Sequence, residues 1–331
     1  MSLRVAVAGA GWVSEYHLSA WKSLPHIEVV AICDPQLPRA QARAREFGVA
    51  RAYSNAAEML DTMRPDALDI AAPVEVHASL CRLAADRGVH ILCQKPLAPT
   101  LQEAQQIVVD IAGRVRLMVH ENWRFRPQYR QIRRWLDEGA LGQPVSCSMR
   151  VRSSGLLADA DGRFAQIDRQ PFFATLKRLL IGELLIHHLD VVRWLMGPMD
   201  VRFAHTGRSS AAVQGEDHAV IVLGSEDRTA VVDGSLVAAG TASKPHDQFE
   251  LLGTHGAAFF AADQVRIAGL RNETIAIDAD SAYRASYAGA IGHFAEALAS
   301  GTPFETEPGD NLQTLALVED AYAMARSSQQ R

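Results

Sequence analysis

LRVAVAGAGWVSEYH (residues 3–17) joins an apolar run, two glycines and the start of a helical segment. The run LRVAVAG (3–9) ends in glycine, and a second apolar run, IEVVAICD (27–34), follows the helical segment. Strands that are apolar on both faces and alternate with helices predict a parallel sheet covered on both sides. The first part of the chain is therefore predicted to be an α/β domain.

The same alternation continues to about residue 121. The expected further strands are 67–73, 89–94 and 115–121, and a short segment, ARAYS (50–54), follows the second helix. The expected helices are 12–24, 38–48, 55–62, 75–86 and 100–112.

The pattern changes after about residue 122, where alternating strands predict a large, mostly antiparallel sheet with one open face. The expected strands are 144–154, 199–207, 218–225, 229–239, 248–262 and 273–278, and the expected helices are 127–138, 176–196, 284–299 and 310–327. We therefore expect two domains, 1–122 and 123–331, with the last helix packing back on the first. Residues 153–174 have no clear period, and a loop of this length is usually functional or disordered.

Composition limits the partners of the chain. Its 331 residues carry a formal net charge of −5 without a basic block, which argues against nucleic acid and anionic membranes. No apolar run reaches the roughly 18 residues that span a bilayer, and the N-terminus is typical of a first strand rather than a signal peptide. Four scattered cysteines without a CxxC pair indicate buried thiols in a reducing cytoplasm.

Gly9 and Gly11 lie between the first strand and the first helix, where a tight turn brings backbone close to a pyrophosphate. Ser14 stands at the third glycine position of GxGxxG, so the pattern is imperfect. Asp34 ends the second strand, where a carboxylate accepts hydrogen bonds from an adenosine ribose and repels a 2′-phosphate. NAD is the expected cofactor, with NADP as the alternative because Arg39 and Arg43 lie nearby. The competing interpretation is a flavodoxin-like domain whose glycines only form a turn.

HILCQKPLA (90–98) places Lys95 directly after a buried strand and before a proline. The carboxyl ends of parallel strands share one edge of the sheet, so Lys95 is expected to face the cofactor. The alternative is an ordinary surface charge. The full set of expected cofactor-binding residues is Gly9, Gly11, Trp12, Val13, Asp34, Pro73, His77, Gln94 and Lys95.

GELLIHHLDVVRWLMG (182–197) places Glu183, His187 and Asp190 on one stripe of a largely apolar helix. A carboxylate one turn from an imidazole can orient it and raise its basicity, which suits a general base. A buried structural histidine and a metal site are the alternatives. His188 faces elsewhere, no further His/Cys cluster joins this stripe, and no metal is expected.

The chain resembles the glucose-fructose oxidoreductase / inositol dehydrogenase / rhizopine catabolism (GFO/IDH/MocA) family over essentially its whole length. The segments that carry the resemblance are AGAGWVSEYH, CQKP, RFRP, GELLIHHLDVVRWLMG and LQTLALVEDAYAMAR. The family usually has Glu where this chain has Gln94, and Asp where it has Glu183. The resemblance implies a Rossmann domain, an open-sheet second domain, and hydride transfer between nicotinamide and a sugar, polyol or inositol-like carbinol. It also implies a homodimer or homotetramer formed through the open sheet face.

The expected catalytic residues are Lys95, His187 and Glu183: His187 takes the hydroxyl proton, Lys95 stabilises the alkoxide, and Glu183 orients His187. Gln94 removes a carboxylate that would favour the charged lysine, so Lys95 could share the base role. The expected substrate-binding residues are Lys95, Asn122, Trp123, Arg124, Arg169, Glu183 and His187. Glu121, Arg163 and Gln170 are weaker expectations by position. The alternative functions are a non-catalytic NAD(P)-binding sensor and a reductase of another carbonyl or imine.

Overall fold

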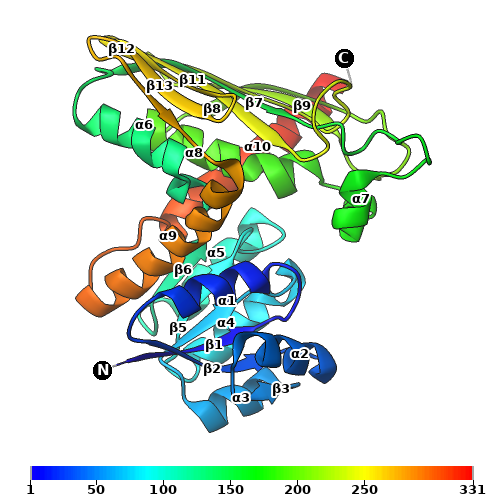
Figure 1. Ribbon diagram of the computed structural model, residues 1–331, viewed down its shortest axis with the longest axis vertical. Helices are drawn as coiled ribbons and strands as arrows, with labels where there is room; N and C mark the ends of the chain where they lie inside the picture. Colours follow the sequence, from blue (N-terminus) through cyan, green and yellow to red (C-terminus); the bar gives the residue numbers. More distant parts are fainter. Residues whose placement is uncertain (1, 330–331) are drawn as a thin grey trace. The chain divides into compact units, whose positions relative to one another are not determined.

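A computed structural model describes residues 2–329, which divide into two compact units. Unit 1 comprises Met1–Phe125 and Tyr283–Leu315, and unit 2 comprises Arg126–Ala282 and Ala316–Arg331. The first division lies three residues after the predicted boundary at 122/123. Residues 283–315, which were predicted in the second domain, group instead with the first. Each unit is described separately below (Figure 1).

Within the described residues, unit 1 contains a six-stranded parallel sheet in the order β3-β2-β1-β4-β5-β6. The strands are β1 (Leu3–Ala8), β2 (Ile27–Cys33), β3 (Ala52–Tyr53), β4 (Ala67–Ile70), β5 (His90–Gln94) and β6 (Leu117–His120). β4 and the last four residues of β5 are entirely buried, which explains why these runs are apolar without alternation.

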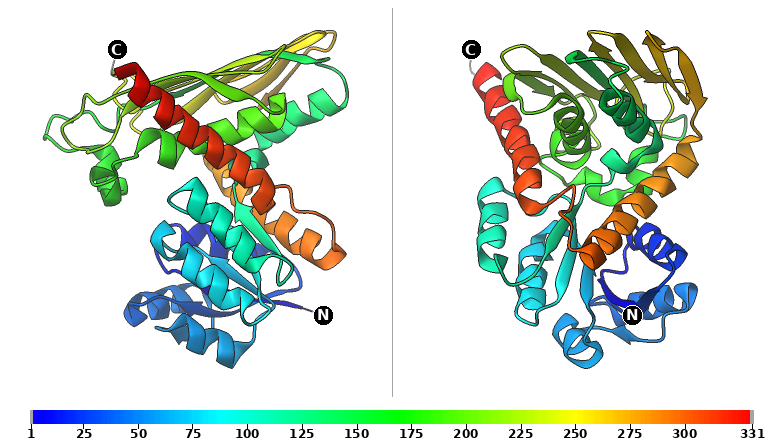
Figure 2. Two further views of the ribbon diagram at one scale, coloured as in Figure 1. Left: turned by 180° about the vertical axis from the view of Figure 1, so that it is seen from behind. Right: turned by 90° about the vertical axis from the view of Figure 1, so that its left-hand side faces the viewer.

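Helices lie on both faces of this sheet (Figure 2). The elements are α1 (Ser14–Ser23), α2 (Leu37–Phe47), α3 (Ala56–Met63), η1 (Val74–Val76), α4 (His77–Ala85), α5 (Leu101–Ile111) and η2 (Trp123–Phe125). The strand order runs outward from β1 in one direction and from β4 in the other. Right-handed crossovers therefore place the helices of the two halves on opposite faces.

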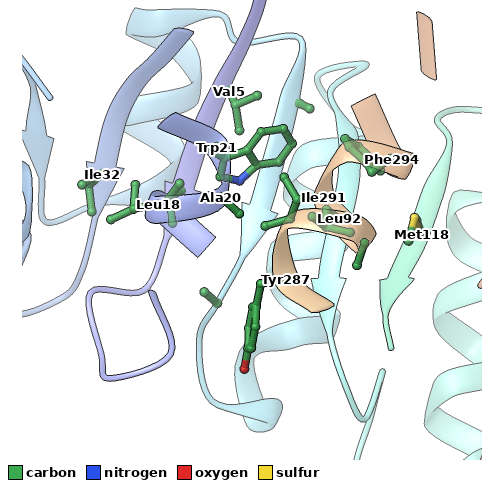
Figure 3. Close-up of a cluster of buried hydrophobic side chains, with 14 of the residues drawn as sticks. Val5, Leu18, Ala20, Trp21, Ile32, Leu92, Met118, Tyr287, Ile291 and Phe294 are labelled. Carbon is green, nitrogen blue, oxygen red and sulfur yellow. The ribbon is translucent and has the colours of Figure 1, made fainter. Parts of the chain in front are cut away.

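The core of unit 1 joins the sheet to α1 and to α9 (Ala279–Ser300), most of which belongs to this unit. Trp21 is fully buried, and its ring meets Phe294 edge-on with 6.1 Å between centroids. Figure 3 shows Trp21, Ile291 and Phe294 beside Leu92 and Met118 of the sheet. Helix α9 thus covers apolar surface that α1 alone leaves open.

Within the described residues, unit 2 contains an eight-stranded sheet in the order β14-β13-β12-β11-β7-β10-β9-β8. The strands are β7 (Pro144–Arg152), β8 (Asp200–Gly207), β9 (His218–Gly224), β10 (Thr229–Ser235), β11 (His246–Gly253), β12 (Gly256–Ala261), β13 (Gln264–Gly269) and β14 (Glu273–Ala276). Only the pairing of β7 with β10 is parallel among these described strands. Alternate residues of β9 and β10 are buried, as expected for a sheet with one covered face.

The helical elements of unit 2 include two that lie on the same side of its sheet, α6 and α8 (Figure 1). The elements are α6 (Pro127–Asp137), α7 (Ala165–Arg169), η3 (Pro171–Ala174), η4 (Leu180–Leu185), α8 (Ile186–Met196) and most of α10 (Pro308–Gln329). No helix of the described residues is long and apolar enough to cross a membrane. The predicted fold class, a parallel Rossmann sheet followed by a mostly antiparallel open sheet, is confirmed.

Two predicted elements of unit 2 are wrong in detail. The expected strand 248–262 is a hairpin of β11 and β12, and β13 was not predicted. Ala262 and Asp263 turn the chain into β13 with positive φ, but without the glycine that usually marks such a turn. The expected helix 176–196 starts at Leu180, and its first part, η4, is π-helical.

Candidate active site

The two central strands of the parallel sheet, β1 and β4, are paired up to their carboxyl ends at Ala8 and Ile70. Gly9 follows β1 with φ +106°, and a Cβ on it would lie 2.2 Å from the Ala71 carbonyl oxygen. Only glycine fits this turn, because it must both adopt a left-handed φ and approach the β4 loop closely. Dinucleotides bind at such a point in open α/β sheets, where the strand order reverses.

Gly11 lies at the other end of the same turn and has no atom within 4 Å of the position of a Cβ. The space beside its backbone is therefore open, which fits a pyrophosphate at the N-terminus of α1. Ser14, in place of the third glycine, is buried and donates a hydrogen bond from its hydroxyl to the Gly11 carbonyl at 2.7 Å. Between them, Trp12 is 45% exposed and Val13 precedes the helix.

Asp34 fixes the glycine turn from the end of β2. Its carboxylate accepts hydrogen bonds from the Ala10 N–H at 3.0 Å and from the Gln36 N–H at 2.9 Å. A carboxylate has about four acceptor positions, so others remain for ribose hydroxyls. Arg43 pairs with Glu46 at 2.8 Å and donates to the Gly11 carbonyl at 3.2 Å. The residues present therefore fit a dinucleotide. Asp34 holds the glycine turn in shape and has further acceptor positions for the ribose.

His77 connects the loop after β4, which contains Pro73, to the turn after β5. Its ring nitrogens lie 3.0 Å from the Pro96 carbonyl oxygen and 2.9 Å from that of Ala72. The side chain is 1% exposed, and burial lowers the pKa of its imidazole. The His77 ring thus lies between the peptide after Lys95 and the β4 loop. As a neutral imidazole it carries one N–H and donates to only one of these two carbonyl oxygens.

Lys95 follows β5 at the same edge of the sheet, is partly exposed, and precedes a cis peptide bond to Pro96. Behind it, the Gln94 side chain lies in a buried polar chain. The Gln94 amide nitrogen is 2.7 Å from His17 Nε2 and 3.1 Å from His120 Nδ1. The Gln94 amide oxygen accepts a hydrogen bond from the Lys95 backbone N–H at 3.1 Å.

His17 continues this polar chain toward Asp69 in the middle of β4. His17 Nδ1 lies 2.8 Å from the Asp69 carboxylate, which also accepts a 2.7 Å hydrogen bond from the Trp21 indole N–H. His17 and Asp69 are both 0% exposed. His17, Asp69 and His120 were not predicted from the sequence as site residues. An aspartate inside an otherwise apolar, doubly covered strand was a signal, because a buried charge requires partners.

The polar residues after β6 are engaged within unit 1. Asn122 donates to the Ser286 hydroxyl at 2.8 Å. Arg124 is 2% exposed and pairs with Asp310 at 2.5 Å. Trp123 is buried, with its ring 6.0 Å from that of Tyr283. These contacts attach α9 and the start of α10 to the sheet, and a substrate role for the three residues stays a prediction.

Glu183 and His187 lie in unit 2, in the π-helical segment η4 and in α8 respectively. Glu183 is partly exposed, and His187 is 5% exposed. A π-helical turn spaces side chains differently from an α-helix, so the single α-helical stripe expected for them is interrupted before α8 begins. Such segments occur often at functional sites.

A buried carboxylate from another part of unit 2 accepts hydrogen bonds from backbone N–H groups at the start of η4. Glu216 accepts backbone hydrogen bonds from Leu179 at 3.3 Å and from Ile181 at 3.0 Å. The Tyr322 hydroxyl donates to Glu216 at 2.5 Å and accepts from the Gly182 N–H at 3.0 Å. Burial, followed by the charge of Glu216, raises the pKa of Tyr322 well above its usual range. No local sequence pattern pointed to Glu216 or Tyr322, because their partners are remote in the chain.

His188, next to His187 in α8, contacts a buried carboxylate of unit 2. Its Nε2 lies 2.9 Å from Asp247, which also receives hydrogen bonds from Tyr129 at 2.8 Å and Arg126 at 3.0 Å. Arg169, at the end of α7, donates to the Gln166 side chain. Within residues 2–329, no group of three or more His, Cys, Asp or Glu side chains is placed to hold a metal ion.

All four cysteines lie among the described residues as free, buried thiols. Burial, with the charge of Asp34 as a second cause, raises the pKa of Cys33 to about 11. Burial also raises the pKa of Cys93 and of Cys147. The prediction of buried cysteines is confirmed.

Comparison with known proteins agrees with this architecture. A family model described as an oxidoreductase family with an NAD-binding Rossmann fold matches residues 3–122, and the GFO/IDH/MocA C-terminal domain matches residues 129–259. Together, the fold and the site define an oxidoreductase with an NAD-binding Rossmann domain. The chain belongs to the GFO/IDH/MocA family, and the predicted resemblance is confirmed.

Named relatives match nearly the whole chain. D-Apiose dehydrogenase of Paraburkholderia graminis is 36% identical across 97% of this chain and 87% of that protein. D-Apiose dehydrogenase of Rhizobium rhizogenes is 31% identical across 98% of this chain and 95% of that protein. A crystal structure of an oxidoreductase from Agrobacterium radiobacter, in complex with NAD+, L-tartaric acid and magnesium, has a TM-score of 0.91 and 29% identity. It covers 99% of this chain and 97% of that one.

Proposed function

We propose that this chain is an NAD-dependent dehydrogenase that oxidises a carbinol of a small sugar, polyol or inositol-like substrate. The observation that carries the proposal lies within unit 1: Lys95 is at the same carboxyl edge of the parallel sheet as Gly9, Gly11 and Asp34. A cation at that edge is suited to stabilise an alkoxide beside a bound nicotinamide. When bound, NAD supplies the hydride acceptor.

We assign the proton chemistry to three side chains. His187 takes the proton of the reacting hydroxyl, Lys95 stabilises the developing negative charge, and Glu183 orients the imidazole. The family match supports this assignment, because the two matching family models cover residues 3–122, which include Lys95, and residues 129–259, which include Glu183 and His187. Asn122, Trp123, Arg124 and Arg169 remain proposed substrate contacts.

NAD is the proposed cofactor in preference to NADP. Gly9, Gly11, Trp12 and Val13 would hold the pyrophosphate, and Asp34 the adenosine ribose. Support comes from the Asp34 carboxylate, which faces the turn and would repel a 2′-phosphate. Pro73, His77, Gln94 and Lys95 are the proposed nicotinamide-side residues.

The test is an absorbance assay at the NADH band with aldoses, ketoses, inositols and sugar acids. D-Apiose belongs in the first set because two relatives that match nearly the whole chain are named for it. Turnover with a sugar and NAD, and weaker turnover with NADP, is the expected result. Measurable NAD binding without turnover of any carbinol would contradict the proposal and favour a sensor.

We also propose that copies of the chain associate through the open face of the eight-stranded sheet. The exposed large apolar side chains of this sheet include Val145, Phe203 and Leu252, which supports a partner for that face. Sedimentation equilibrium should give a dimer or tetramer, and Phe203→Lys should shift it toward monomer. A monomeric wild-type protein at micromolar concentration would contradict this.

The buried thiols support a reducing compartment, the cytoplasm.

A further inference from the structure

The hydrogen bonds of Gln94 determine which way its amide points. The Lys95 backbone N–H is a donor, so the Gln94 atom that faces it must be the carbonyl oxygen. The amide NH₂ therefore faces the two imidazoles, 2.7 Å from His17 and 3.1 Å from His120. Both nitrogens that face it must be acceptors, because an NH₂ group can only donate.

The same bonds assign the proton on each ring. His17 Nε2 accepts from Gln94, so the His17 proton is on Nδ1, which donates to Asp69. His120 Nδ1 accepts from Gln94 and carries no proton. The series of hydrogen bonds therefore runs from one carboxylate, Asp69 in the middle of β4, through His17 and Gln94 to the Lys95 backbone. Both imidazoles in it are neutral.

A carboxylate at position 94 would change this arrangement. Glutamate can only accept, so the ring nitrogens facing it would need protons. His17 would then have to be doubly protonated between Asp69 and the new carboxylate. The other titratable groups that face the chain are His120 on β6, Cys93 and Lys95 around β5, and Tyr287 on α9, whose ring lies 5.5 Å from that of His17. Besides Asp69, none of them supplies a fixed negative charge.

We propose that Gln94 is a positioning residue that joins the Lys95 backbone to two neutral histidines. The hydrogen bonds that hold the Lys95 backbone in place are then independent of pH. The replacement of the family's usual glutamate by Gln94 then has a functional consequence. The hydrogen bond between residue 94 and His17 no longer depends on a second proton on His17, next to the residue that stabilises the alkoxide. This proposal rests on the proposed function of Lys95, but the hydrogen-bond chain can be tested without activity.

The first experiment is ¹⁵N NMR of wild-type protein labelled in histidine, with His17 and His120 assigned by their single substitutions to Gln. His17 should show a protonated Nδ1 and an unprotonated Nε2, and His120 an unprotonated Nδ1. A proton on His17 Nε2 would overturn the proposal even if no substrate had been found. Absent turnover with these NMR signals intact would contradict only the proposed function.

The second experiment compares pH–rate profiles of Gln94→Glu and wild type. Because the doubly protonated His17 loses its proton as pH rises, the deficit in kcat should grow from about twofold at about pH 6 to about tenfold at about pH 9. The affinity for NAD should change far less than kcat. Gln102→Glu on the exposed face of α5 makes the same change in net charge and should keep the wild-type profile. Parallel profiles for Gln94→Glu and wild type would overturn the proposal.

Discussion

At the scale of the residue, Lys95 combines partial exposure with a tightly held backbone. Its N–H is bonded to Gln94, and the carbonyl of the next residue lies against His77. A flexible four-carbon side chain thus extends from a fixed peptide, which limits the positions its ammonium group can reach. This is the arrangement expected of a group that must meet a developing charge without reorganising.

Replacement of Lys95 tests that role. Lys95→Ala should lower kcat by about 10²- to 10³-fold, the cost of removing a donor that stabilises an oxyanion. NAD affinity, measured by NADH fluorescence titration, should change by less than about threefold because the dinucleotide turn is untouched. Lys22→Ala, on the exposed side of α1, is the matched control. Near-normal turnover of Lys95→Ala would remove Lys95 from the reaction.

At the scale of the element, the two glycines of the β1–α1 turn have different roles: Gly9 is required by the fold, and Gly11 leaves space for the dinucleotide. Gly9→Ala forces a Cβ against the Ala71 carbonyl in a left-handed conformation, so unfolding free energy should fall by about 2 kcal/mol or more. Gly11→Ala meets open space and should keep its stability. It should instead weaken NAD binding, because the methyl group occupies the volume beside the backbone. Denaturant titration and NAD titration of both variants check this, and equal losses of stability would be inconsistent with it.

The second element-scale prediction concerns the start of η4. Tyr322→Phe removes the hydroxyl that links Glu216 to the Gly182 N–H, so the segment that holds Glu183 should lose its alignment. We expect kcat to fall about tenfold with little change in NAD affinity. Stability should fall by about 1–2 kcal/mol, since a buried carboxylate loses a partner. Tyr53→Phe on β3 is the control, and a loss of stability with unchanged kcat would limit Tyr322 to a structural role.

At the scale of the whole molecule, each unit attaches helices to its sheet by a buried carboxylate: Asp69 in unit 1 and Asp247 in unit 2. Desolvation acts to raise the pKa of Asp247. The charge and hydrogen bond of His188, with the charge of Arg126 and the hydroxyl of Tyr129, outweigh it, and the pKa lies well below its usual range. A carboxyl whose folded pKa is depressed stabilises the fold above its unfolded pKa and loses that contribution as pH falls.

Asp247→Asn should therefore lower the unfolding free energy near neutral pH by about 3 kcal/mol, since it leaves buried positive groups without their partner. The difference from wild type should shrink as pH falls below about 4, the unfolded pKa of aspartate. Urea titrations across this range provide the measurement. Asp200→Asn, at an exposed ion pair with Arg202, should change little. If the difference in unfolding free energy between Asp247→Asn and wild type grew as pH falls, the pKa of Asp247 would not be lowered in the folded state.

Much of this protein could be predicted from local sequence because its first unit repeats one pattern. Apolar strands followed by helices predicted five of the six described strands of the parallel sheet, and the sixth, β3, lies in the short ARAYS segment, for which no strand was predicted. The same pattern located Gly9, Asp34 and Lys95 at strand ends. β13 escaped prediction because the turn before it, at Ala262 and Asp263, contains no glycine or proline, and a single aspartate is a weak turn signal.

The sequence by itself determined the alternating strands and helices of the first unit, the glycine turn and the family, because each depends on residues close together in the chain. Tertiary structure alone decided the buried chain from Asp69 through His17 to Gln94, and the capping of η4 by Glu216 and Tyr322. Their partners are separated by 52, 77 and 106 positions. A buried polar group must find a hydrogen-bond partner, but which one it finds depends on which strands and helices the fold brings together.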